Sequence, residues 1–159
     1  MIERPTLAEI DELVKCWKAL VRTQRTHGTI VQVDGNTQTA AEWFGDLLQM
    51  DNVRIARING EIVGFVTYVV ELDRFVREKT VGYVQNLYVR ENHRGSGIGT
   101  ALLASAESEL AARGADIVTL ETMESNTKAA AFYREQGYTL HRQTFAKALD
   151  QTDKHNSPD

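Results

Sequence analysis

The run ENHRGSGIGTALL at residues 91–103 constrains the fold most strongly, because it places three glycines within five positions. The apolar stretch GYVQNLYV precedes this run and is typical of a buried strand, while Ile98, Leu102 and Leu103 follow it at helical spacing. A strand that enters a helix through a glycine-rich turn directs several backbone N–H groups, and the positive end of the helix dipole, toward one point. The sequence therefore predicts an α/β fold with an anion site, most often a phosphate site, at this loop.

Two capping boxes predict the first two helices. Thr6 with Glu9, and Thr39 with Glu42, have the spacing at which each side chain can bond the other residue's backbone N–H. The polar connection RTQRTHGTIVQVDGNTQ lies between these helices and is longer than most loops of compact domains. We therefore expect this connection to form a wall of a substrate site.

Turn and cap residues mark the elements on both sides of the glycine loop. Asn59-Gly60 predicts a tight hairpin turn, because both central residues of such a turn adopt positive φ. Asn126 predicts the start of a helix that ends at Gly137. We expect three further short strands, with the sequences DIVTLET, YTLHR and TFAKAL.

The length and composition fit one α/β (α+β) domain over residues 1–150, followed by a polar, frayed tail over residues 151–159. The 22 acidic and 18 basic residues give a formal charge of −4 without long charged blocks, which argues against a general nucleic-acid or membrane-surface binder. The single cysteine, Cys16, is typical of a core residue in a reducing compartment, so we expect a cytoplasmic protein. The four histidines show no paired spacing, so we expect no metal site.

Three kinds of anion loop compete for the glycine run. A nucleotide-triphosphatase loop needs a lysine after its last glycine, but Thr100 follows Gly99. A dinucleotide-binding loop fits Gly95 and Gly97, with Glu121 at the distance of a ribose-binding acid, but its third glycine comes one residue early. The third pattern is Arg94-x-x-Gly97-x-Gly99, and it fits without exception.

With this pattern the chain closely resembles the GNAT superfamily of acyl-CoA-dependent N-acetyltransferases, whose pyrophosphate loop has the form [QR]-x-x-G-x-[GA]. The resemblance continues through LETMESNTKAAAFYREQGY, which is similar to the family's next strand, asparagine and tyrosine-bearing helix. TFAKAL resembles its closing strand. The resemblance covers residues 59–149, whereas the first fifty residues match only in element order. It implies a GNAT-like domain with a mixed central sheet of about six to seven strands and about four helices.

The resemblance also implies the residues that bind acetyl-CoA and transfer its acetyl group to an amine. The strand backbone would pair with the pantetheine arm, the loop N–H groups would hold the pyrophosphate, and Asn126 would bond the arm. Tyr133 would donate a proton to the leaving thiolate, for which a neutral phenol is suited. The implied cofactor-binding residues are Leu87, Tyr88, Val89, Arg94, Gly95, Ser96, Gly97, Ile98, Gly99, Thr100 and Asn126.

The general base departs from a common family pattern. Many members carry acids in the strand before the loop, but this chain has Gln85 and Asn86 there, and an amide cannot accept the proton. Glu121, which ends the next strand, is the better candidate, with Glu124 as a weaker one and bulk water as the alternative.

Several alternatives stay open at this point. The amide pair leaves room for a module that binds CoA without catalysis, and a nicotinamide-cofactor enzyme is a third reading. The acceptor could be a primary amine of a small molecule or of a protein or peptide, and Arg22, Arg25 and His27 could contact an acidic one. A homodimer would be unsurprising for a domain of this size.

Overall fold

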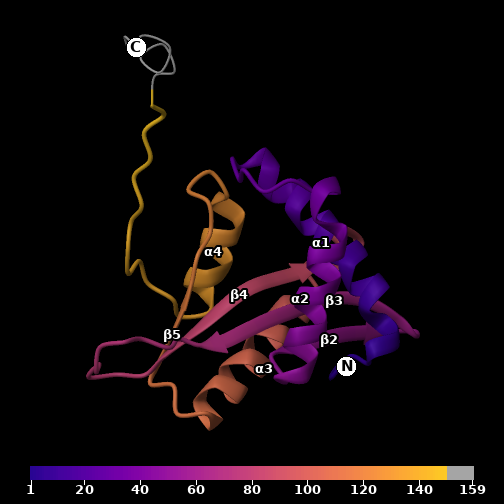
Figure 1. Cartoon of the computed structure of the whole chain (residues 1–159), viewed down its shortest axis with the longest axis horizontal. Helices are drawn as coiled ribbons and strands as arrows, with labels where there is room; N and C mark the ends of the chain where they lie inside the picture. Colours follow the sequence, from indigo (N-terminus) through magenta and orange to yellow (C-terminus); the bar gives the residue numbers. More distant parts are fainter. Residues whose placement is uncertain (150–159) are drawn as a thin grey trace, which may run out of the picture.

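The computed structural model describes residues 1–149, and its elements form a sheet with helices on both faces (Figure 1). The predicted tail over residues 151–159 lies outside the described residues. The strands are β1 (Ile2–Glu3), β2 (Val53–Ile58), β3 (Glu61–Val70), β4 (Val81–Val89) and β5 (Ile117–Leu120). The helices are α1 (Ile10–Thr26), α2 (Thr37–Gln49), α3 (Ile98–Ala112) and α4 (Thr127–Glu135), with short 3-10 turns at Leu7–Glu9, Asp34–Asn36 and Glu91–His93.

The five strands follow one another across the sheet in chain order. Neighbours from β1 to β4 are antiparallel, whereas β4 and β5 are parallel because the crossover through α3 returns the chain in the same direction. Asn59 (φ 50°) and Gly60 (φ 82°) form the turn between β2 and β3, which confirms the predicted hairpin.

The prediction of six to seven strands is wrong for the described chain, which has five. The segments YTLHR and TFAKAL form no strand, and the chain beyond Tyr138 runs away from the sheet (Figure 1). Leu140 and Phe145 in this segment are 69% and 91% exposed. A segment with a strand-like sequence forms a strand only where the edge of a sheet can hydrogen-bond its backbone N–H and C=O groups. These two segments lie against no such edge.

Two apolar clusters separate the faces of the sheet. α1 and α2 cover one face, where Phe44 and Phe65 pack edge to face at 5.5 Å. α3 covers the other face through residues such as Leu102 and Leu110, and α4 packs beside it. Gly64 permits the close approach of β3 to β4, because a Cβ there would lie 2.5 Å from the Tyr88 carbonyl oxygen.

Helix boundaries differ from the capping signals by a few residues. The Thr6 N–H donates to a Glu9 carboxylate oxygen at 2.9 Å, as predicted, but this box begins a 3-10 turn that leads into α1. α2 begins at Thr37 with Asn36 as its N-cap, three residues before the predicted cap Thr39. Because α1 also continues to Thr26, the connection between the two helices is shorter than predicted.

A buried arginine joins β2 to α3 at the end of the sheet. The Arg54 side chain is 6% exposed, and its guanidinium lies 2.7 Å from an Asp51 carboxylate oxygen and 3.1 Å from a Glu109 carboxylate oxygen. The Tyr68 ring lies below Arg54 and Arg113, at 5.9 Å and 5.4 Å from their guanidinium carbons. Burial raises the pKa of the Tyr68 phenol to about 12.

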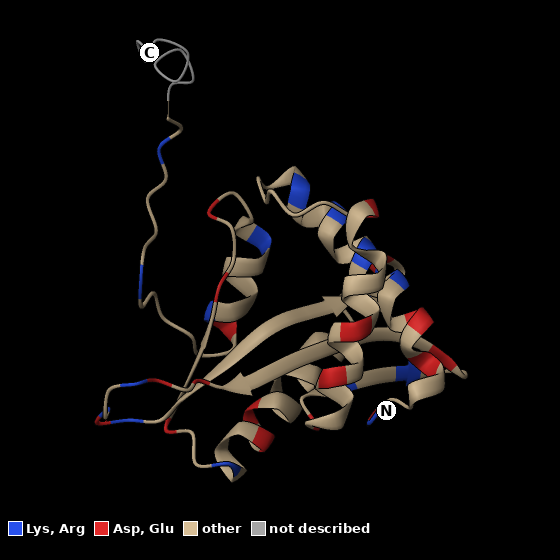
Figure 2. Ribbon diagram, viewed as in Figure 1, with Lys and Arg blue, Asp and Glu red and all other residues tan. Residues whose placement is uncertain are grey.

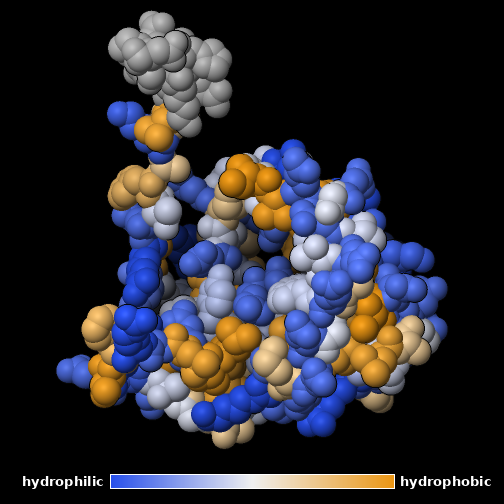
Figure 3. Space-filling view, in the orientation of Figure 1, coloured by the Kyte–Doolittle hydropathy of each residue, from blue (hydrophilic) through white to orange (hydrophobic). Residues whose placement is uncertain are grey.

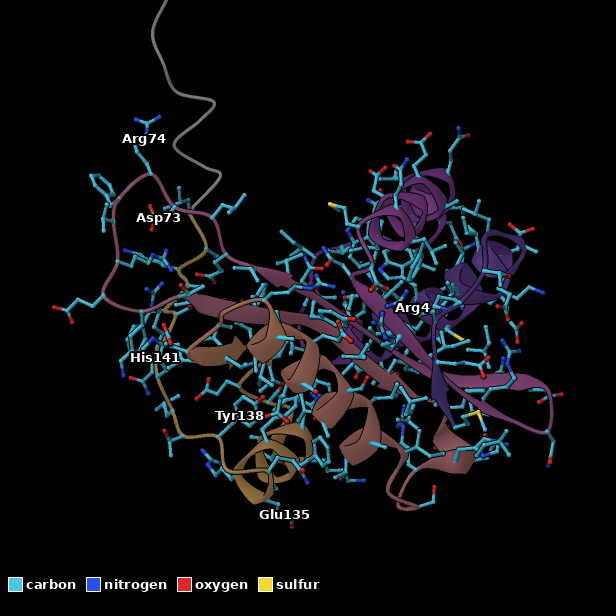
Figure 4. All side chains as sticks on the ribbon, turned by 90° about the horizontal axis from the view of Figure 1, so that it is seen from below. Arg4, Asp73, Arg74, Glu135, Tyr138 and His141 are labelled. Carbon is cyan, nitrogen blue, oxygen red and sulfur yellow. The ribbon has the colours of Figure 1, made fainter. Side chains whose placement is uncertain are left out.

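The connection between β3 and β4 projects from the edge of the molecule. Asp73 and Arg74 lie at its tip, away from the helices (Figure 4). Arg77 in this connection forms ion pairs with Glu71 (2.9 Å) and Asp73, all at the surface. The connection is therefore remote from the glycine loop.

Candidate active site

The glycine loop presents a row of unused backbone donors. Gly95 (φ 79°) and Gly97 (φ 86°) adopt left-handed conformations, and Gly97 is the N-cap of α3. Within residues 1–149, the N–H groups from Gly95 to Thr100 donate to no other group of the chain. A Cβ at Gly95 or Gly97 would meet nothing within 4 Å, so the space before these donors is open. Such an arrangement suits an anion that carries several oxygens.

Side chains fix the shape of this loop. Arg94 donates from Nε to the carbonyl oxygen of Val89 at 2.8 Å, which ties the loop to the end of β4. The Ser96 hydroxyl donates to the carbonyl oxygen of His93 at 2.7 Å. Arg94 is exposed, so its positive charge remains beside the free N–H groups.

β4 and β5 separate before either approaches the loop. Their pairing ends at Val84 with Leu120, and the β3 register skips Gln85, which makes Gln85 a bulged residue. Leu87, Tyr88 and Val89 then pair with β3 on one side and with no described strand on the other. The side chains of Leu87 and Val89 pack into the core on the α3 side and that of Tyr88 on the α1 side. The backbone N–H and C=O groups on the other edge of this segment are therefore left without a strand partner among the described residues.

A cavity of about 110 Å³ lies where the two strands diverge. Glu121, Asn126 and Tyr133 all line it, together with Gln85 and the end of α1 at His27. The space-filling view shows a recess between α1 and α4 (Figure 3). Three residues that the sequence predicts for the site thus converge on one space, although their roles stay predictions.

Tyr133 is held on α4 by other aromatic rings. The Phe132 and Tyr138 ring centroids lie 5.5 Å and 6.2 Å from that of Tyr133. Burial raises the pKa of the Tyr133 phenol above its ordinary value, so the hydroxyl keeps its proton at neutral pH. The phenol can therefore act as a proton donor to a strongly basic atom in the cavity.

α4 connects this cavity to the glycine loop. Asn126 begins the helix, because its side chain accepts the Ala129 N–H at 3.2 Å, and this confirms the predicted cap. Phe132 lies 3.5 Å from the position that a Cβ at Gly99 would occupy. Near the end of α4, the Gln136 amide donates to the Thr100 hydroxyl at 3.2 Å.

Comparison with known proteins identifies this arrangement. The sequence model of the Acetyltransferase (GNAT) family matches residues 17–138, which is most of the chain. The chain belongs to the GNAT acetyltransferase family. The predicted GNAT membership is thereby confirmed.

Relatives of this GNAT chain have varied names. An aminoalkylphosphonate N-acetyltransferase of Salmonella typhimurium is 35% identical over 96 residues, which are 60% of this chain and 62% of that protein. An uncharacterized N-acetyltransferase of Archaeoglobus fulgidus is 34% identical over 86 residues, 54% of this chain and 58% of that protein. The chain thus spans about three fifths of the length of these curated relatives. The BH1408 protein of Bacillus halodurans, solved as an F44R mutant, has the same fold, with a TM-score of 0.79 and 20% identity over 94% of this chain and 99% of that one.

The structure adds contacts of Gln85 and His27 that the sequence did not predict. The Gln85 side-chain oxygen is buried and accepts no hydrogen bond within residues 1–149. His27 lines the cavity, and its Nδ1 lies 2.9 Å from the Ser125 hydroxyl, whereas Arg22 and Arg25 do not line it. The sequence identified Gln85 only as an amide in the place of an acid. It gave no signal for the buried, unpartnered oxygen, because the bulge at Gln85 follows from the strand register.

Charge is distributed around this site rather than along β4. The ribbon of β4 is uncharged, and the acidic and basic residues lie on helices, connections and other strands such as β2 (Figure 2). Within the described chain, no group of three His, Cys, Asp or Glu residues could hold a metal ion. No helix of residues 1–149 has the length and apolar character needed to span a membrane.

Proposed function

We propose that the chain transfers an acetyl group from acetyl-CoA to a primary amine by direct attack. The observation that carries this proposal is the continuity of the free N–H groups at the loop, the open edge of β4 and the cavity at Tyr133. An anion site, a backbone edge and a proton donor follow one another in the order of pyrophosphate, pantetheine and thioester along the donor.

The residues of the loop fit a pyrophosphate. The N–H groups from Gly95 to Thr100 bind its oxygens, and the open space before Gly95 and Gly97 admits it without a clash. The free backbone edge of Leu87, Tyr88 and Val89 pairs with the amides of the pantetheine arm. The same edge offers an N–H to the carbonyl oxygen when negative charge develops there.

The reaction forms a C–N bond and breaks the thioester C–S bond. The amine nitrogen attacks the carbonyl carbon, and the Tyr133 hydroxyl gives its proton to the departing thiolate sulfur. Glu121 accepts the proton that the amine loses, directly or through water. The products are the acetamide and free CoA, so atoms and charge balance without another reagent.

Gln85 supports an amine as the acceptor. Its buried side-chain oxygen lacks a donor among the described residues, and a buried acceptor without a donor is costly. Gln85 lines the cavity, so rotation of its side chain would let an amine N–H supply that donor. Gln85 thereby holds the nucleophile without taking its proton, which remains the task of Glu121.

Tyr133→Phe, measured by release of free thiol from acetyl-CoA in the presence of amines, tests the chemistry. We expect kcat to fall by about 100-fold, since general acid catalysis contributes roughly that factor or more. The matched control is Tyr138→Phe, because Tyr138 does not line the cavity. This variant removes the hydroxyl that lies 3.2 Å from a Glu107 carboxylate oxygen. Equal kcat for Tyr133→Phe and wild type would refute the acid assignment.

Calorimetry with acetyl-CoA tests the donor separately. Failure to bind acetyl-CoA refutes the proposed function. Binding without transfer to any amine favours the CoA-binding module, for which Gln85 and Asn86 in place of acids are the supporting observation.

A further inference from the structure

A second cavity lies between α1 and α2, beside the first. It has a volume of about 350 Å³, and Gln24 and Asn86 line both cavities. We call it the α1–α2 slot. Trp17 and Gln24 face it from α1, Asn36 and Trp43 from the start and middle of α2, and Asn86 from β4. Its volume lies within the range of about 300–1,000 Å³ that is usual for small-ligand pockets.

The lining of the slot has a definite chemistry. Trp17 and Trp43, the only tryptophans of the chain, are both half-buried and pack against the core. The polar lining residues are three amides and Thr39, and no Asp, Glu, Lys or Arg lines the slot. Indole faces bind flat apolar groups, while amides bond uncharged polar ones.

The absence of charge from this lining limits what can enter. A second ammonium or a phosphonate placed there would meet no counter-charge among the lining residues, whereas an aromatic ring would meet two indoles. Polyamines, aminoglycosides and aminoalkylphosphonates therefore fit the slot poorly. An uncharged ring on a short chain fits well, because its amine can reach Glu121 in the first cavity while the ring remains between α1 and α2.

Hydrogen bonds hold the walls in position. Asn86 donates from Nδ2 to the Thr67 hydroxyl at 3.1 Å, which leaves its side-chain oxygen available at the junction of the two cavities. Arg25 donates to the carbonyl oxygen of Val31 at 2.9 Å and so fixes the connection at the rim. The slot is therefore built by residues of α1, α2 and β4 that are already ordered by other contacts.

We propose that the α1–α2 slot is the acceptor site and that it selects primary monoamines with an uncharged aromatic body, the arylalkylamine class. This rests on the proposed function, because the slot receives an acceptor only if the cavity beyond it transfers an acetyl group. The acceptor ring lies between Trp17 and Trp43, and its chain passes Gln24 and Asn86 toward Gln85.

Tryptophan fluorescence tests binding independently of catalysis, since both reporters line the slot. Phenethylamine, titrated with CoA present, is expected to change the emission saturably. Spermidine and 2-aminoethylphosphonate, as a polycation and an anion, are expected to leave it unchanged at the same concentrations. A saturable response to either of those two, or none to phenethylamine, overturns the proposal.

Kinetics with acetyl-CoA and phenethylamine test the role in turnover. Trp43→Leu is expected to raise the KM for phenethylamine by about tenfold, the scale of one lost aromatic contact, without changing the KM for acetyl-CoA. Phe75→Leu removes an exposed aromatic ring from the β3–β4 connection, outside both cavities, and is expected to retain the wild-type KM. A Trp43→Leu variant with wild-type KM for phenethylamine overturns the proposal.

Thr39→Glu tests the slot independently of whether the tryptophan variant folds, because Thr39 is exposed on α2 and its replacement leaves the core intact. The added carboxylate is expected to let spermidine change the tryptophan emission, while 2-aminoethylphosphonate still leaves it unchanged. Unchanged selectivity overturns the proposal. If acetyl-CoA binds and a different amine class is acetylated, the acceptor class is wrong and the proposed function stands; if acetyl-CoA does not bind, the proposed function itself fails.

Discussion

Replacing Gly97 by alanine separates the anion-binding role of the loop from its role in folding. Gly97 (φ 86°) begins α3, and Gly114 (φ 92°) follows its other end. A Cβ at either residue would meet nothing within 4 Å. Each alanine should therefore cost about 1–2 kcal/mol of folding free energy, the strain of a left-handed residue with a side chain. Gly114→Ala is thus a control matched in strain and in helix.

The two variants differ in what lies before the added methyl group. At Gly97 the methyl is added within the run of free N–H groups, beside which we propose that the pyrophosphate lies. Loss of one hydrogen bond to a charged group costs about 1.5–3 kcal/mol. Because 1.4 kcal/mol corresponds to a tenfold change, Gly97→Ala should raise the Kd for acetyl-CoA by about 10-fold to 150-fold.

Calorimetric titration with acetyl-CoA measures the Kd, and thermal unfolding measures the shared folding cost. We expect the Tm of both variants to fall together, while Gly114→Ala keeps the wild-type Kd. A wild-type Kd for Gly97→Ala, or an equal loss of binding in both variants, would refute the assignment of the loop to the pyrophosphate.

Three further predictions concern stability, measured by urea unfolding. The pKa of the Tyr68 phenol is about 12 in the folded state, against about 10 in the unfolded state. The free energy of unfolding should therefore fall by about 3 kcal/mol as the pH rises from about 10 to about 12, and Tyr68→Phe should lack this decrease. Arg54→Met should cost about 1–3 kcal/mol, because it removes the hydrogen bonds of a buried guanidinium to two carboxylates that are 35% exposed, while Arg77→Met at the surface should leave the midpoint unchanged; equal effects would contradict the burial argument. Gly64→Ala should cost about 1–3 kcal/mol by forcing β3 from the Tyr88 carbonyl, and a wild-type midpoint would show that the strands separate freely.

Local chemistry made much of the fold predictable. Asn59-Gly60 encodes its turn through positive φ, and Asn126 encodes its helix start through one side-chain hydrogen bond. Each signal depends on a few neighbouring residues, so it can be read without the rest of the molecule. The start of α2 was misplaced because Asn36 and Thr39 both have side chains that cap helices, and only the packing of the helix selects between them.

Features that depend on distant residues were harder to predict. The residues after Tyr138 have the composition of strands, but a strand also needs an edge, and local sequence does not report whether an edge is reached. The convergence of Glu121 and Tyr133 on one cavity follows from element order and was anticipated through resemblance. The orphaned oxygen of Gln85 was not, because it depends on a register shift between β3 and β4.

The contacts of α4 have a consequence for the size of the donor. α4 contacts the glycine loop through Phe132 and Gln136. The same helix places Tyr133 at the first cavity. Helical rise is fixed, so the separation between the free N–H groups of the loop and the Tyr133 phenol is fixed with it. If these groups bind the pyrophosphate and the thiolate as we propose, α4 sets the length of pantetheine arm that the site accepts, and a thioester on a longer or shorter arm would not reach its proton donor.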